Sequence, residues 1–118
     1  MDQRTFAGVG NIYRAEVLFR ARVNPHREAR NVRRPTFDAM WDDLVMLMRQ
    51  GVRDGHIDTV RPEHEPEAMG RAPRDDRHGG EVYVYRREGQ RCFVCGSKVR
   101  LEEMQGRTLF WCPRCQRR

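Results

Sequence analysis

Four cysteines are the residues of this 118-residue chain whose type and spacing most clearly predict chemistry. They form two Cys-x-x-Cys pairs with sixteen residues between them: Cys92, Cys95, Cys112 and Cys115. Each pair can form a tight knuckle that presents two thiolates, and a hairpin between the knuckles brings the four sulfurs into the tetrahedral arrangement that zinc prefers. The spacing therefore predicts one structural zinc ion, with no ligand position left open for catalysis.

Two other uses of paired cysteines compete with zinc binding. Redox Cys-x-x-Cys motifs use one pair at the start of a helix, whereas both pairs here are expected to flank strands. Disulfides are disfavoured because the first ten residues, MDQRTFAGVG, lack the layout of a secretion signal, so we expect a cytoplasmic protein with reduced thiols. The longest apolar run, LVMLM, is far too short for a membrane helix.

The residues between the two cysteine pairs are expected to form a β-hairpin. Apolar residues alternate in the strand manner on both sides of a turn near residues 105–107, at Val99, Leu101, Leu109 and Trp111. A module of this size cannot build a core alone, so metal ligation, on the order of 10–16 kcal/mol in small zinc peptides, would supply most of its folding energy. Arg107 at the hairpin tip could make a bidentate contact to a phosphate. The alternative is that such a zinc ribbon serves only to support the fold.

The rest of the chain predicts helices and a linker. A first helix is expected to end near residue 7, broken by Gly8-Val9-Gly10-Asn11, and a second to run from Ile12 to a stop at Asn24-Pro25. Residues 36–53 have the strongest helical period, which predicts a core helix that ends at Gly55; its apolar positions are Phe37, Met40, Trp41, Leu44, Val45, Met48 and Val52.

The remaining residues before the cysteines predict a linker and a short strand. Residues 56–80 have no period and read as a loop with solvated histidines, and residues 81–87 alternate as a strand. We therefore expect a mainly α protein with a small β zinc finger, organised as a helical unit (1–55), a linker (56–80) and a strand followed by the finger (81–118).

The net charge of +6 is unevenly distributed along the chain. Residues 4–34 hold eight arginines against two acids, residues 35–85 hold six against eleven, and residues 86–118 hold nine cations against three. Two basic ends suit a polyanion that touches both, because non-specific nucleic-acid binding is largely phosphate neutralisation. The arginine-rich composition of a GC-rich genome would give the same charges without such a role.

Three stretches together resemble the formamidopyrimidine-DNA glycosylase and endonuclease VIII family of repair enzymes. They are AGVGNIYRAEVLFRARVNP (7–25), VYRREG (84–89) and GRTLFWCPRCQ (106–116). The resemblance implies a helix-two-turns-helix domain and a zinc finger that bind double-stranded DNA, damaged or abasic. It also implies that Asn11 and Arg107 grip phosphates beside the lesion, with Tyr85 as a further phosphate contact. Gly10 would let the DNA backbone come close to a helix that starts near Ile12.

The resemblance leaves the catalytic part of the family unmatched. Family members begin with a proline-glutamate terminus on a β-sandwich domain, whereas this chain begins Met-Asp-Gln inside the helical domain. We therefore expect the DNA-binding half of a DNA glycosylase and AP lyase, not catalytic by itself, with catalysis on a separate domain. The alternatives are residual lyase activity through the N-terminal amine, and a stand-alone zinc ribbon that binds nucleic acid or protein without a glycosylase role.

Overall fold

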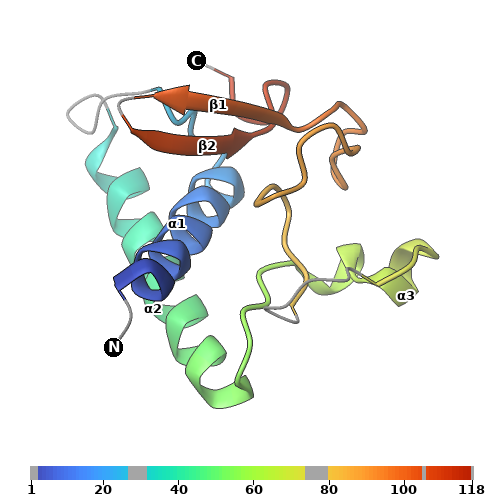
Figure 1. Ribbon diagram of the computed structural model, residues 1–118, viewed down its shortest axis with the longest axis horizontal. Coiled ribbons are helices and arrows are strands. Elements are labelled where there is room, and N and C mark those ends of the chain that lie inside the picture. Colours follow the sequence, from blue (N-terminus) through green and yellow to red (C-terminus); the bar gives the residue numbers. More distant parts are fainter. Residues whose placement is uncertain (1–2, 27–31, 74–79, 105, 118) are drawn as a thin grey trace.

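The computed structural model describes residues 3–26, 32–73, 80–104 and 106–117, with the backbone alone described at residues 3–9, 104 and 107. Its elements in chain order are α1 (Gln3–Arg20), α2 (Arg34–Asp54), η2 (Pro62–His64), α3 (Pro66–Met69), β1 (Arg100–Met104) and β2 (Arg107–Trp111). The two long helices lie against each other, and the antiparallel hairpin of β1 and β2 covers one end of α1 (Figure 1). The predicted mainly helical fold with a small β finger is confirmed. No described helix is both long and apolar enough to cross a membrane.

The predicted break between two N-terminal helices is wrong. Helix α1 continues through Gly8 and Gly10, and Asn11 lies within it rather than at the start of a second helix. A glycine inside a helix costs about 1 kcal/mol relative to alanine. The turns that follow bury Ile12 and Tyr13, each worth about 1.5–3 kcal/mol, which offsets that cost.

Helix α1 also ends four residues before the predicted stop at Asn24. Arg22 adopts a left-handed conformation with φ of 59°. The amide of Val23 donates to the carbonyl of Leu18 at 2.9 Å, and the amide of Arg22 donates to Phe19 at 2.9 Å. This pair of bonds is a Schellman arrangement, which satisfies the last carbonyls of a helix.

Helix α2 has the predicted end but not the predicted burial. As expected, Gly55 ends the helix: its φ is 76°, and its backbone amide donates a hydrogen bond to the carbonyl of Gly51. Of its residues, Leu47 alone is fully buried, packed with Tyr13 and Val17 of α1. The apolar positions of α2 spread over a wider arc than α1 can cover, so Trp41 and several others face solvent.

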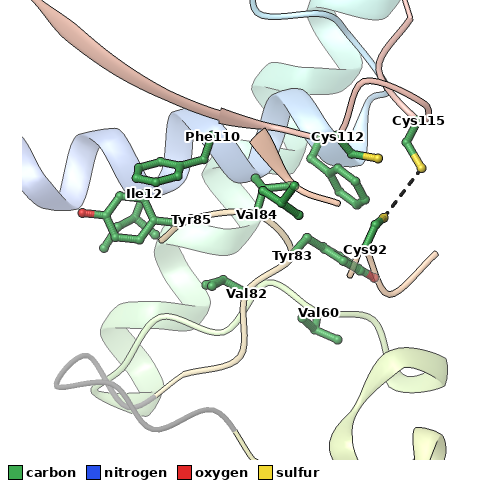
Figure 2. Packing of buried hydrophobic residues seen from close by; sticks show 12 residues of the cluster. Ile12, Val60, Val82, Tyr83, Val84, Tyr85, Cys92, Phe110, Cys112 and Cys115 are labelled. Atoms are coloured by element: carbon green, nitrogen blue, oxygen red, sulfur yellow. Dashed lines mark hydrogen bonds between the residues drawn. The ribbon is translucent and has the colours of Figure 1, made fainter. Parts of the chain in front are cut away.

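The predicted strand at residues 81–87 is absent from the described part of the chain. Val82, Tyr83, Val84 and Tyr85 are all buried in succession, so the inside-outside alternation of a strand does not occur. Figure 2 shows these four side chains at the centre of the larger core, between α1 and the cysteines. Their backbone amides bind a side chain instead of a neighbouring strand, as described below.

The predicted linker contains the two short helices η2 and α3, and residues 74–79 of it lie outside the described ranges. Its beginning packs into the core through Val60. Its end passes so close to residue 57 that a Cβ atom on Gly80 would lie 1.3 Å from the carbonyl oxygen of Ile57. Glycine is therefore required at position 80 by the fold itself.

Candidate metal centre and functional site

The four cysteines come together at one point, as the sequence predicts. Their sulfur atoms all lie within 4.8 Å of one another. The distance between the sulfurs of Cys92 and Cys115 is 3.8 Å, and that between Cys95 and Cys112 is 3.4 Å. A tetrahedral ion with metal–sulfur bonds of about 2.3 Å separates its ligands by roughly 3.8 Å. Disulfides need about 2.05 Å, so the arrangement fits a shared metal ion and not cross-links.

Local turns position each cysteine pair. In the first pair the amide of Gly96 donates to the carbonyl of Cys92 at 2.9 Å, and the Cys92 amide donates to Ser97 at 2.7 Å. Gly96 has φ of 79°, a left-handed conformation that glycine adopts without strain. In the second pair the amide of Gln116 donates to the carbonyl of Cys112 at 2.9 Å.

The thiols differ in how readily they ionise. Burial opposes ionisation of Cys95, but hydrogen bonds from the backbone and side chain of Ser97, together with those from the Cys112 and Cys115 thiols, outweigh it and lower the pKa of Cys95 to about 6. Burial raises the pKa of Cys112 and of Cys115. A cation at the centre would hold these thiols as thiolates, because metal coordination deprotonates a thiol.

Two buried amides tie the finger to the end of α1, a link that the sequence reasoning missed. The side chain of Gln116 accepts a bond from the Cys112 amide at 2.9 Å and donates to the carbonyl of Val23 at 2.8 Å. In return, the side chain of Asn24 donates to the carbonyl of Gln116 at 2.9 Å. The second knuckle is therefore fixed to the chain that leaves α1.

A second link joins the same region to β1. The imidazole of His26 lies 2.7 Å from a carboxylate oxygen of Glu102 and packs edge-on against the ring of Trp111 at 5.3 Å. An aromatic contact and a polar contact thus also attach the hairpin to the residues after α1. These contacts therefore hold the finger against the end of α1.

Glu16 organises the segment in which a strand was predicted. Its carboxylate is fully buried and accepts four hydrogen bonds, from the amides of Tyr83 (2.6 Å), Val84 (2.9 Å) and Tyr85 (3.1 Å) and from the Thr59 hydroxyl (2.5 Å). Three successive amides turned toward one carboxylate cannot also pair with a neighbouring strand. Nothing local marks Glu16 in the sequence, where it reads as an ordinary helix acid.

Gly10 and Asn11 lie exposed on α1. Asn11 is inside the helix, so the predicted benefit from a helix N-terminus is not available at that position. A Cβ atom on Gly10 would meet open space, so the packing of this chain does not require glycine there. Asn11 is therefore a polar residue exposed on the helix, next to a position that has no side chain.

Tyr85 packs in the core with Ile12 of α1 and Phe110 of β2. The ring of Tyr85 is buried and lies 5.2 Å from that of Phe110. Figure 2 shows Ile12, the residue after Asn11, beside both rings. Gly106 forms the hairpin turn with φ of 77°, and β2 begins at Arg107, whose side chain lies outside the description.

Several cations of the basic ends serve the fold instead of an outer surface. Arg20 makes a two-pronged contact with Asp43, at 2.7 and 2.9 Å. Arg87 is buried, stacks 3.6 Å above the ring of Phe93 and donates to the Tyr83 carbonyl. The charge totals of the sequence therefore overstate the cations available to a partner.

The histidines hold no metal site among the described residues. His56 is exposed, and His64 lies 2.7 Å from the hydroxyl of Tyr83, a contact that the expectation of solvated histidines missed. His78 falls outside the described residues.

Comparison with known proteins identifies the family. Residues 1–61, just over half of the chain, match the formamidopyrimidine-DNA glycosylase H2TH domain. The chain belongs to this family. The match includes α1, α2 and Thr59, whose hydroxyl donates to Glu16, so the family region and the buried core overlap.

Relatives of the glycosylase family extend the similarity through the finger. The chain is 50% identical to Endonuclease 8 1 of Mycobacterium tuberculosis over 116 residues, which are 98% of this chain and 42% of the relative. It is 37% identical to formamidopyrimidine-DNA glycosylase of Prochlorococcus marinus over 99% of this chain and 39% of that protein. The chain thus spans less than half the length of these relatives and corresponds to their C-terminal portion.

Solved structures show the same fold. A crystal structure of Lactococcus lactis Fpg with DNA that contains an abasic site superposes with a TM-score of 0.68, at 24% identity, over 92% of this chain and 37% of that one. A structure of MutM with DNA that contains carbocyclic 8-oxo-G gives a TM-score of 0.67 at 24% identity, over 92% and 37%.

Proposed function

We propose that this chain is the DNA-gripping C-terminal half of a base-excision-repair DNA glycosylase and AP lyase of the bacterial cytoplasm. Its partner would be double-stranded DNA that is damaged or abasic, and its cofactor one zinc ion on the four cysteines. The observation that carries this proposal is the attachment of the four-cysteine finger to α1 through Gln116 and Asn24. This attachment lets two separate phosphate-binding elements act on one duplex.

The grip would use two kinds of phosphate contact. Asn11, exposed on α1, would donate its side-chain amide to a phosphate oxygen, and Gly10 beside it would let the DNA backbone approach. Arg107, at the start of β2, would offer a planar guanidinium that can bind a phosphate with two parallel bonds. Such contacts position a duplex without reading its sequence, and they help offset the cost of turning a damaged base out of the stack.

The remaining residues would support that grip. Tyr85 would support a phosphate contact from a fixed position. Its ring packs against Phe110 of β2, and its backbone amide donates to the carboxylate of Glu16. Zinc would supply structure only, by holding both knuckles of the finger in place. The division into units at residues 1–55, 56–80 and 81–118 stays a prediction.

Binding to a duplex with one abasic-site analogue tests the proposed grip. Asn11→Ala and Arg107→Ala should each weaken binding by roughly ten- to a hundred-fold, because a hydrogen bond to a charged group is worth about 1.5–3 kcal/mol. Arg49→Ala is the matched control, since Arg49 is an exposed arginine on α2, outside α1 and the hairpin. All variants should keep one zinc per chain. Unchanged affinity in both test variants, with zinc retained, would refute the grip.

Borohydride trapping on an abasic duplex tests the assignment of catalysis to another domain. This chain alone should give no covalent adduct, because the family's proline amine has no counterpart in its sequence. A trapped adduct would show that an amine of this chain reaches the sugar aldehyde and would assign lyase activity to the chain itself.

A further inference from the structure

The ring of Phe93 lies between two arginines that come from different parts of the chain. Phe93 directly follows Cys92 in the first knuckle of the finger. The guanidinium carbon of Arg71 lies 3.8 Å from the centre of the ring, and that of Arg87 lies 3.6 Å from it. On a single face, two carbons this near the ring centre would clash, because non-bonded carbons stay about 3.5 Å apart. The two guanidinium groups therefore stack on opposite faces of the ring.

Other contacts fix both arginines in place. Arg71 forms a mostly buried ion pair with Glu81 at 2.7 Å and donates to the carbonyl of His64 at 2.8 Å. Arg87 is buried and donates to the carbonyl of Arg91 at 2.6 Å. A side chain that is already held loses little further rotamer freedom when a ring stacks on it. The arginines thus form a preformed slot for the ring.

Arg71 ends a segment, residues 61–71, that holds η2 and α3. Helices of three and four residues are not stable alone, so this segment depends on contacts to the rest of the chain. One such contact is the hydroxyl of Tyr83, which accepts from the amide of Arg61 at 3.0 Å and lies 2.7 Å from the imidazole of His64. The stack of Arg71 on the finger is another.

We propose that Phe93 is a clasp through which the zinc ion and segment 61–71 stabilise each other. The ring enters its slot only while the first knuckle keeps its turn, in which the amide of Val94 donates to the sulfur of Cys92 at 3.4 Å. A metal ion on the cysteines would hold that turn. Coupling between two equilibria is reciprocal, so whatever opens the clasp weakens zinc binding, and loss of zinc frees the segment. The clasp rests on the proposed zinc site but not on the proposed grip on DNA.

Zinc affinity, measured by competition with a chromogenic chelator, tests the effect of the clasp on the metal. Phe93→Leu keeps an apolar side chain but removes the ring faces. It should weaken zinc binding at least about five-fold, which corresponds to about 1 kcal/mol, the size of one cation–π contact. Val94→Ala is the matched control, since Val94 is the next residue of the same turn and is exposed. It should leave the affinity unchanged.

A double-mutant cycle tests whether Arg71 acts through the ring. Arg71→Met should also weaken zinc binding. The double variant with Phe93→Leu should be weakened by less than the product of the two single effects, because both substitutions remove the same contact. The ion pair of Arg71 with Glu81 is lost with either residue at position 93, so its contribution cancels in the cycle.

Hydrogen exchange followed by mass spectrometry tests the effect of the clasp on segment 61–71. Four of its amides, those of His64, Glu65, Met69 and Arg71, are hydrogen-bonded within the segment. In the zinc-loaded Phe93→Leu variant these amides should exchange at least about five-fold faster than in the parent, because local opening becomes easier. The amides of α2 should exchange at the parent's rate.

Three results would overturn the clasp. The first is unchanged zinc affinity in Phe93→Leu. The second is weaker zinc binding with unchanged exchange in segment 61–71, since Phe93 would then support the knuckle alone. The third is a double variant whose effect equals the product of the single effects. If Phe93→Leu lacks the circular dichroism of the parent, Arg71→Met carries both measurements with the same criteria. A parent chain that binds no zinc would refute the metal centre and the clasp together.

Discussion

Replacement of Glu16 by glutamine is the sharpest test of how the core holds residues 83–85. The amide has the shape of the carboxylate but only one accepting atom. Its less costly orientation turns the NH₂ group toward Thr59, whose hydroxyl can reverse and accept, and leaves the amide of Tyr83 without an acceptor. A buried donor without a partner costs about 1–3 kcal/mol. The bonds from Val84 and Tyr85 also weaken, because their acceptor becomes neutral.

We expect the variant to lose about 2–4 kcal/mol of unfolding free energy. The loss is not larger because a neutral amide costs less to bury than a charged carboxylate. For a chain of this size that corresponds to a fall in Tm of roughly 8–16 °C. The assay is urea denaturation with zinc present, followed by circular dichroism. Glu103→Gln, at an exposed position on β1, is the control and should change stability by less than about 0.5 kcal/mol. Equal stability of the Glu16→Gln variant and the control would refute the role given to Glu16.

Two further substitutions test other buried contacts. Arg20→Lys should lower the unfolding free energy by about 1–2 kcal/mol, because an ammonium cannot bind both oxygens of Asp43 and the Thr59 carbonyl together; a variant as stable as the parent in the same denaturation assay would contradict this. Gln116→Ala should make the chain release zinc at a lower chelator concentration, because the Cys112 amide loses its acceptor and the finger its bond to Val23; an unchanged competition curve with a chromogenic chelator would show that the link does not support the metal site.

The sequence predicted those features whose physical cause is local. Two cysteine pairs at a fixed spacing predicted the cluster of four sulfurs, since each knuckle needs only its own turn. Gly55 predicted the end of α2, because a glycine readily adopts the left-handed conformation that ends a helix, whatever the rest of the fold. The alternation around residues 105–107 predicted the hairpin of β1 and β2.

The errors arose where the cause lies far away in the chain. The alternation of residues 81–87 indicated a strand, but their amides bind Glu16, 67 to 69 positions earlier. The periodicity of α2 correctly indicated an apolar arc, yet a period cannot say which part of the arc another element will cover. The glycines at positions 8 and 10 suggested a helix break because their cost to helix stability can be read from the local sequence. The burial that offsets this cost depends on residues elsewhere in the chain.

The central claim is that the finger and α1 together hold the phosphates of a duplex, and the salt dependence of binding tests it most directly. Affinity for an abasic-analogue duplex, measured by fluorescence anisotropy at increasing salt, should fall linearly on a log-log plot, with a slope of about −0.9 for each phosphate neutralised. If Arg107 holds one phosphate, the slope for Arg107→Ala should be less steep than that of the parent by about 0.9. Binding that does not respond to salt, or equal slopes for the parent and the variant, would contradict the account.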